Sequence, residues 1–309
     1  MVIPKLQYMN IGFDEAQKWL SSNTGKYCWH LLKELILYSV PNGELLYHFL
    51  NRMPNLEQLM LFYSGYELQE LVVPIANIAP SPQDRLGAVL QLKELVLLES
   101  EINDLGFERH PVLQRLERLS LKCCHKLTNL APRSISLTYL TYLEVSSCKG
   151  LQNLMTSSTA KSLIQLRTMK VTRCDCVKEI VTNERNEQDK VIEIVFSNLI
   201  NLVLVKLVVL TSFCSHKNCE FKFPSLELLT VSKCPMMKTF TKSHTEAPKL
   251  QNIKLAVEGE EGEKRQLEGD LNATIQKLYE DEKKFQREEE AKENDNDLSA
   301  AATRKFDRD

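Results

Sequence analysis

The segment 116–130, LERLSLKCCHKLTNL, decides the fold, because its spacing of apolar residues returns 24 residues later. The second segment, 140–154, reads LTYLEVSSCKGLQNL, and both follow L-x-x-L-x-[LV]-x-x-C-x-x-L-x-x-L. A chain that keeps its apolar positions while the positions between them change contains an internal repeat. The first part of this pattern, L-x-x-L-x-L, also recurs along the rest of the sequence.

Ten copies of this shorter pattern follow one another along the chain. They begin at Leu6, Leu32, Leu56, Leu92, Leu116, Leu140, Leu166, Leu199, Leu226 and Leu250. Most steps span 24 to 27 residues, and the two longer steps contain insertions at about 65–90 and 181–195. Each alternating stretch predicts a short strand with one buried face. Because one copy cannot bury its own leucines, successive copies must stack, which aligns their strands in a parallel sheet. The sequence thus predicts an α/β leucine-rich-repeat solenoid, a curved horseshoe with parallel strands on its concave face.

The ninth position of the pattern is a cysteine in four copies. In leucine-rich repeats this position lies under the turn that follows the strand and is usually Asn or Cys. A thiol is a small buried side chain and a weak hydrogen-bond donor for an otherwise unpaired backbone group. The nine cysteines show no disulfide framework, so we expect free thiols. The cysteines expected to be structural at this turn are Cys124, Cys148, Cys174 and Cys234.

Mixed helices and loops are expected to return the chain from one strand to the next. The segment 42–53 is spaced as a helix, and 156–166 begins with Thr and Ser residues suited to a helix N-cap. The segment 125–136 contains proline and is expected to be irregular.

Three segments divide the chain: a repeat domain over 1–257, an acidic linker with a C-terminal helix over 258–290, and a disordered tail over 291–309. Residues 258–309 hold 17 Asp and Glu against 10 Lys and Arg, a local charge of −7. Within them, 269–286 is spaced as an amphipathic helix with Asp270 as its N-cap. A stack of repeats needs a cover on its open end, and we expect this helix to provide it.

Composition and motifs exclude several functions. With a net charge of −2 and no basic stripe, the chain does not favour nucleic acid as a partner. The sequence has no P-loop, nucleophile elbow or zinc-protease motif, so we expect no enzyme activity and no cofactor. Cys214, His216 and Cys219 are the best metal candidates, but a loop with incidental thiols is favoured over zinc. No signal peptide or membrane-spanning segment is visible, so a cytoplasmic protein without membrane insertion is expected. The pattern makes no prediction of oligomeric state.

The concave face, formed by the third, fifth and seventh positions of each copy, is the candidate binding surface. Its N-terminal third is apolar and aromatic, and its middle is polar, with basic residues expected to be exposed. An exposed apolar patch usually marks a contact surface, and Met and aromatic residues are favoured there. The candidate protein-binding residues are Ile36, Tyr38, Met60, Phe62, Val96, Leu98, Arg118, Lys122, Tyr142, Glu144 and Lys170. Two alternatives stay open: a protein or another domain docks on residues 36–98, or the insertion 65–90 folds over them. An acidic protein surface is a plausible partner for the basic middle.

The segments LERLSLKCCHKLTNL, LEVSSCKGLQNLMTSSTAKSLIQLRTMKVTRCDCVKEIV and FPSLELLTVSKCPMMKTF resemble a known family. They are similar to the leucine-rich repeats of plant intracellular disease resistance proteins that carry an N-terminal coiled coil and a nucleotide-binding domain. The resemblance covers about residues 1–257 and implies recognition of a pathogen effector or a guarded host protein. It also implies that the repeats regulate a nucleotide-binding switch domain.

The chain contains neither the coiled coil nor the nucleotide-binding domain of that family. It is therefore expected to be a fragment of a longer receptor or a truncated relative. The alternative function is a leucine-rich-repeat adaptor or scaffold unrelated to immunity, for example the substrate-recognition arm of a ubiquitin ligase.

Overall fold

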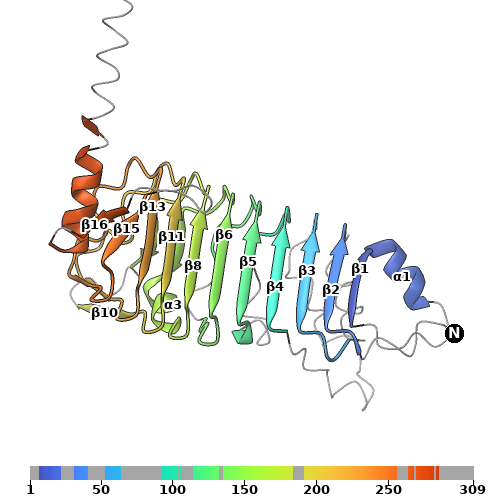
Figure 1. The fold of residues 1–309 in the computed structure, drawn as a ribbon. Coiled ribbons are helices and arrows are strands. Elements are labelled where there is room, and N and C mark those ends of the chain that lie inside the picture. Colours follow the sequence, from blue (N-terminus) through green and yellow to red (C-terminus); the bar gives the residue numbers. More distant parts are fainter. Residues whose placement is uncertain are drawn as a thin grey trace, which may run out of the picture.

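The structure is a computed structural model, and it describes residues 7–21, 31–40, 53–63, 92–103, 105, 114–131, 135–183, 191–255, 264–267, 269–281 and 283–284. Its main feature is an 11-stranded sheet whose strands stand side by side in one row (Figure 1). The strands are β1 (Tyr8–Gly12), β2 (Glu34–Tyr38), β3 (Gln58–Phe62), β4 (Glu94–Leu98), β5 (Arg118–Lys122), β6 (Tyr142–Ser146), β8 (Thr168–Thr172), β11 (Asn201–Val205), β13 (Leu228–Ser232), β15 (Asn252–Lys254) and β16 (Lys264–Gln266). The leucine-rich-repeat solenoid predicted from the sequence is confirmed.

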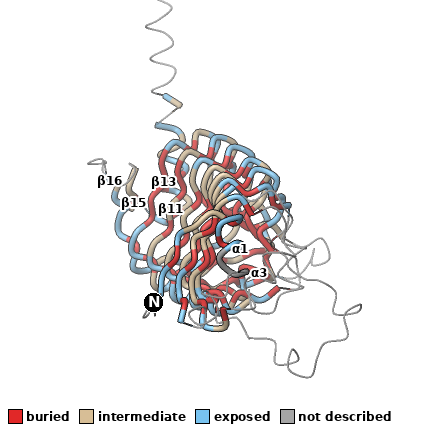
Figure 2. The backbone as a smooth tube through the Cα atoms, turned by 90° about the vertical axis from the view of Figure 1, so that its right-hand side faces the viewer, coloured by how far each residue is buried: buried red, intermediate tan, exposed pale blue. Residues whose placement is uncertain are grey.

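Every one of the ten sequence copies supplies one parallel strand of this sheet. Equivalent motif positions pair across neighbours; for example, Arg118 pairs with Tyr142, and Tyr142 with Thr168. The motif leucines Leu116, Leu119 and Leu121 are at most 1 % exposed. Figure 2 looks along the row of coils and shows the buried residues lining their inside. Stacking of equivalent leucines thus sets the register of the whole sheet.

The residue after each long strand has a left-handed backbone in eight coils, and none of the eight is glycine. Their φ angles lie between 52° and 57°. In this conformation the backbone N–H reaches the next coil; that of Ser147, for example, donates to Thr172 O at 2.9 Å. In seven of the eight coils the left-handed turn therefore extends the sheet ladder by one bond, which offsets the cost of the conformation. The eight residues are Ser39, Tyr63, Glu99, Cys123, Ser147, Arg173, Lys206 and Lys233.

The return segments contain strands as well as the expected helices and loops. Strands β7 (Asn153–Thr156) and β9 (Glu179–Thr182) form a two-stranded parallel sheet. Strands β10 (Ile192–Val195), β12 (Cys219–Lys222) and β14 (Thr245–Glu246) form a three-stranded one. Helix α3 (Ser157–Ser162) starts as predicted, with Thr156 Oγ1 accepting from Thr159 N at 3.4 Å. The helix expected over 42–53 lies almost entirely outside the described residues.

Aromatic side chains replace leucines in the core behind the C-terminal coils. Their ring centroids lie 4.9 to 6.2 Å apart, in stacked and edge-on pairs. Such pairs contribute about 0.5–1.5 kcal/mol each beyond the area they bury. The five residues, all 0 % exposed, are Phe196, Phe213, Phe221, Phe223 and Phe240.

Both ends of the sheet are covered. Helix α1 (Phe13–Ser21) follows β1 and buries Phe13 and Ala16. At the other end β16 pairs antiparallel with β15, which the sequence did not predict. A helix over 271–281 then packs on the last coil, with Leu271 and Ile275 each 2 % exposed. The predicted C-terminal helix is thus present; the acidic tail lies outside the described residues.

The predicted N-cap and a second polar residue hold this last helix in place. Asp270 Oδ1 accepts from Ala273 N at 2.7 Å. Asn272 Oδ1 accepts from the backbone N of Thr241 at 2.8 Å and from the hydroxyl of Thr239 at 3.0 Å. Asn272 therefore ties the helix to the last turn of the solenoid.

Candidate protein-binding face

The candidate binding residues lie where the alternation predicts, on the face of the main sheet opposite the leucine core. In β2, β3 and β4 the second and fourth residues are buried, while the first, third and fifth keep part of their surface accessible. Because the strands pair in register, the odd positions form straight rows across the sheet. The concave face is therefore a continuous surface built from many coils.

The apolar part of this face comprises six side chains from three adjacent strands. Tyr38 and Phe62 pair in register and stack, with ring centroids 4.9 Å apart and an interplanar angle of 30°. Met60 lies in register between Ile36 and Val96 in the neighbouring row. All are half-buried by their neighbours, which holds the side chains in place while leaving an accessible apolar surface. The insertion 65–90, which the alternative reading folds over them, lies outside the described residues.

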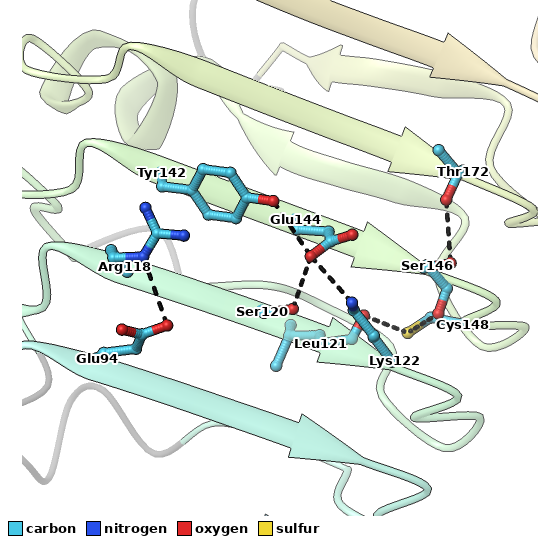
Figure 3. A network of polar contacts seen from close by, with 10 residues as sticks. All are labelled: Glu94, Arg118, Ser120, Leu121, Lys122, Tyr142, Glu144, Ser146, Cys148 and Thr172. Atoms are coloured by element: carbon cyan, nitrogen blue, oxygen red, sulfur yellow. Dashed lines mark hydrogen bonds and ion pairs between the residues drawn. The ribbon is translucent and has the colours of Figure 1, made fainter. Parts of the chain in front are cut away.

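The polar middle of the face is a network centred on Glu144 (Figure 3). A carboxylate oxygen of Glu144 accepts from the Ser120 hydroxyl at 3.0 Å and from the Tyr142 hydroxyl at 3.2 Å, and it pairs with Lys122 Nζ at 3.2 Å. Burial alone would raise the pKa of Glu144, but the Ser120 hydroxyl and the Lys122 ammonium outweigh burial and lower the pKa below its ordinary value. Glu144 is thus held as a charged, oriented acceptor.

Arg118 continues this network toward the apolar part. Its Nε lies 3.4 Å from a Glu94 carboxylate oxygen, and its guanidinium carbon lies 4.1 Å from the centre of the Tyr142 ring. An arginine placed over an aromatic ring and beside a carboxylate has a fixed orientation. The network therefore runs across three neighbouring strands, β4, β5 and β6.

The structure corrects one expectation about this middle region. Arg118, Lys122 and Lys170 were expected to be exposed; Arg118 is exposed, but Arg118 and Lys122 are each paired with a carboxylate. Lys122 and Lys170 are half-buried rather than exposed, and Lys170 lies in register beside Glu144. The Arg118–Glu94 and Lys122–Glu144 pairs neutralise most of the charge of this region, because the one-coil spacing places opposite charges on adjacent strands. The charge of this region gives little attraction for an acidic partner.

Two further residues belong to this network although they were not singled out from the sequence. Ser120 is 8 % exposed and donates to Glu144, and Glu94 orients Arg118. The signal that could have identified them is the repeat register: residues 94, 118 and 142 hold one motif position in consecutive copies, and 120 and 144 hold another.

The four turn cysteines contact the coil that precedes them. The thiol of Cys148 lies 3.8 Å from Leu121 O and 3.4 Å from Ser146 O, and Cys174 makes the equivalent contacts with Val145 O and Thr172 O. Neighbouring thiols also face one another: the hydrogen bond with Cys124 raises the pKa of Cys148 to about 12. Each thiol is thus a small polar contact between two stacked turns.

The metal candidates do not form a ligand set. Cys214 and Cys219 are buried next to each other, and this contact raises the pKa of the Cys214 thiol, whereas His216 is exposed. No group of three His, Cys, Asp or Glu side chains able to hold a metal occurs within the described part of the chain. None of the helices described is long and apolar enough to cross a membrane.

Ten in-register coils with a leucine core and an accessible parallel sheet define a leucine-rich-repeat protein. Residues 128–257 match the family of plant disease resistance protein RPS2-like leucine-rich repeats. This region is therefore similar to the leucine-rich repeats of plant disease resistance proteins. Comparison with curated proteins finds no match.

Proposed function

We propose that the chain is a non-catalytic protein-recognition module in plant defence that binds its partner on the concave face. The observation that carries this proposal is the apolar patch Ile36, Tyr38, Met60, Phe62, Val96 and Leu98, which adjoins an oriented polar network. Apolar centres beside satisfied polar groups are the arrangement found in protein interfaces. The family matched by residues 128–257 supports the link to defence.

The fixed side chains of this face favour binding a folded protein. Stacking limits the rotamers of Tyr38 and Phe62, and the hydrogen bonds to Glu144 limit the rotamer of Glu144, before any partner binds. Binding then costs less side-chain entropy than it would on a flexible surface. The polar network would add specificity, because a partner must match its donors and acceptors to avoid leaving them unpaired.

The partner that this function requires is a pathogen effector, a guarded host protein, or the nucleotide-binding domain of a parent receptor, in the cytoplasm. The repeats over 1–257 would carry the binding surface, and the segment 258–290 would close their end. Regulation would follow if the effector and the nucleotide-binding domain compete for the same face, since binding of either shifts the occupancy of the other.

The test replaces the centre of the apolar patch by charge. Met60→Glu with Phe62→Glu places two carboxylates in the patch without touching the leucine core. The matched control is Tyr139→Glu with Ile164→Glu, two apolar residues outside the concave face that are 51 % and 45 % exposed. Both variants are expected to keep the circular dichroism spectrum of the wild type.

The readout is quantitative affinity enrichment from plant leaf extract, followed by direct binding of each enriched protein. Proteins bound by the wild type and by the control variant should bind Met60→Glu/Phe62→Glu about a thousandfold more weakly, since two central interface residues that contribute about 2 kcal/mol each account for about 4 kcal/mol. Retention of the same proteins at the same affinity by this variant would refute binding on the concave face.

A further inference from the structure

A second surface, separate from the concave face, lies on the rim where the C-terminal strands end. Lys149, Arg173, Lys206 and Lys233 line a hollow of about 480 Å³ there, together with Ser147, Asp175 and Val208. We call these four cations the basic rim. They come from four consecutive coils, those of β6, β8, β11 and β13.

The backbone places these cations in a row. Arg173, Lys206 and Lys233 each follow a strand directly and share the left-handed conformation, with φ angles of 54°, 55° and 55°. Arg173 N donates to Val205 O, and Lys206 N donates to Ser232 O, both at 2.9 Å. Adjacent strands lie about 4.8 Å apart, so the three side chains leave the rim at this spacing.

The residue types at these positions are not explained by backbone conformation. Gly, Asn and Asp tolerate the left-handed region best, and long side chains have no advantage there. What the coils of β8, β11 and β13 share at this position is positive charge. Cations on adjacent coils repel one another, and a bound anion would relieve this repulsion.

The basic rim is also unpaired, in contrast to the concave face. Arg118 and Lys122 have carboxylate partners, whereas no carboxylate among the described residues forms an ion pair with any of the four rim cations. Asp175 is the single acidic residue lining the hollow, so the lining carries a charge of +3. Lys149, Arg173 and Lys233 are exposed and can reach a ligand.

We propose that the basic rim binds an acidic segment of a partner polypeptide, independently of the concave face. An extended chain rises about 3.3 Å per residue, so the three coil steps of the rim, about 14 Å, span four to five residues. Val208, which is 45 % exposed in the same hollow, offers an apolar contact for one side chain of that segment. The lining has no aromatic ring on which a base could stack, which disfavours single-stranded nucleic acid.

The experiment measures fluorescence anisotropy of a labelled oligoglutamate peptide, with an oligothymidylate of the same length in a parallel series. The triple variant Arg173→Glu/Lys206→Glu/Lys233→Glu reverses the charge of the basic rim. The control is the triple variant Lys161→Glu/Lys217→Glu/Lys242→Glu, which changes the net charge by the same amount at three exposed lysines outside the basic rim. A further variant, Arg173→Asn/Lys206→Asn/Lys233→Asn, uses a residue that tolerates the left-handed backbone, so the fold is retained.

The wild type and the control should bind oligoglutamate, and both rim variants should bind it about tenfold more weakly, the effect of losing three surface ion pairs. Oligothymidylate should bind more weakly than oligoglutamate. Equal affinity of the asparagine variant and the wild type for oligoglutamate would overturn the proposal. Binding of the oligothymidylate but not of the oligoglutamate by the wild type would also overturn the proposal.

Discussion

Replacement of Gly150 by alanine should destabilise the stack at one defined point. Gly150 lies in the turn after Cys148, against the equivalent turn of the preceding coil. A Cβ at this position would lie 2.5 Å from Leu127 O and 2.6 Å from His125 O. Gly150 has no positive φ, so close approach of the two turns, and not backbone conformation, requires glycine here.

The size of the effect follows from these two distances. Ordinary contacts begin at 3.4 Å, so the turns must separate by about 0.8 to 0.9 Å. Both opposing atoms belong to backbone, which cannot rotate away as a side chain could. Overpacking of this kind costs about 1–3 kcal/mol, and we take about 3. Reduced freedom of the unfolded chain returns about 1 kcal/mol, which leaves a loss of about 2 kcal/mol in the free energy of unfolding.

Thermal unfolding followed by circular dichroism should therefore show a Tm lower by about 4–8 °C. Hydrogen exchange should accelerate in segments 116–130 and 140–154, which meet at this contact. Gly12→Ala is the control, because the nearest atom to its Cβ would be the flexible Glu15 carboxylate at 3.5 Å, and its Tm should stay within about 2 °C of the wild type. A Gly150→Ala variant with an unchanged Tm would refute the close stacking of these turns.

Three further outcomes are expected. Asn272→Ala should lower the free energy of unfolding by about 1–3 kcal/mol, because the backbone N of Thr241 loses its acceptor. Hydrogen exchange in the helix over 271–281 should become faster, and an unchanged exchange rate would contradict this role of Asn272. The pKa of Cys148 is raised to about 12 in the folded state, above about 8.5 in the unfolded chain, so its contribution to stability is complete below pH 8.5 and is lost as the pH rises toward 12. Cys148→Ala should flatten the alkaline unfolding curve, and an equally steep curve would rule this out. Of the described thiols, Cys123 and Cys176 should react rapidly with a thiol reagent before denaturation and the buried ones slowly; rapid reaction of all of them would show that the turns are open.

The repeat made the main sheet predictable down to its register. Leu116 and Leu140 hold the same motif position, so the pairing of Arg118 with Tyr142 follows from stacking alone. The cap at Thr156 was also predictable, because a hydroxyl at a helix start has a local function. In these segments the local pattern and the repeat period predict the same structure, and neither prediction depends on a distant part of the chain.

The return strands and the polar network were not predictable to the same degree. Segments such as 153–156 are too short to show a clear alternation, and they become strands because 179–182 lies beside them one coil later. Strand β16 lies beyond the last copy and pairs in the opposite direction, so no repeat indicates it. The face residues were predicted one by one, but their pairing into a neutral network depends on side-chain rotamers that a pattern does not specify.

Distances between spin labels on the first residue of β2, β5 and β13 test the central claim, an in-register stack of coils, most directly. Glu34, Arg118 and Leu228 hold this motif position and are exposed, so each can carry a label once the cysteines outside the buried set are replaced by serine. The sheet order places three strand steps between the first two and four between the last two. At about 4.8 Å per step the account predicts backbone separations of about 14 and 19 Å, and about 34 Å between Glu34 and Leu228. A Glu34–Leu228 distance shorter than the Arg118–Leu228 distance would contradict a continuous row of stacked strands.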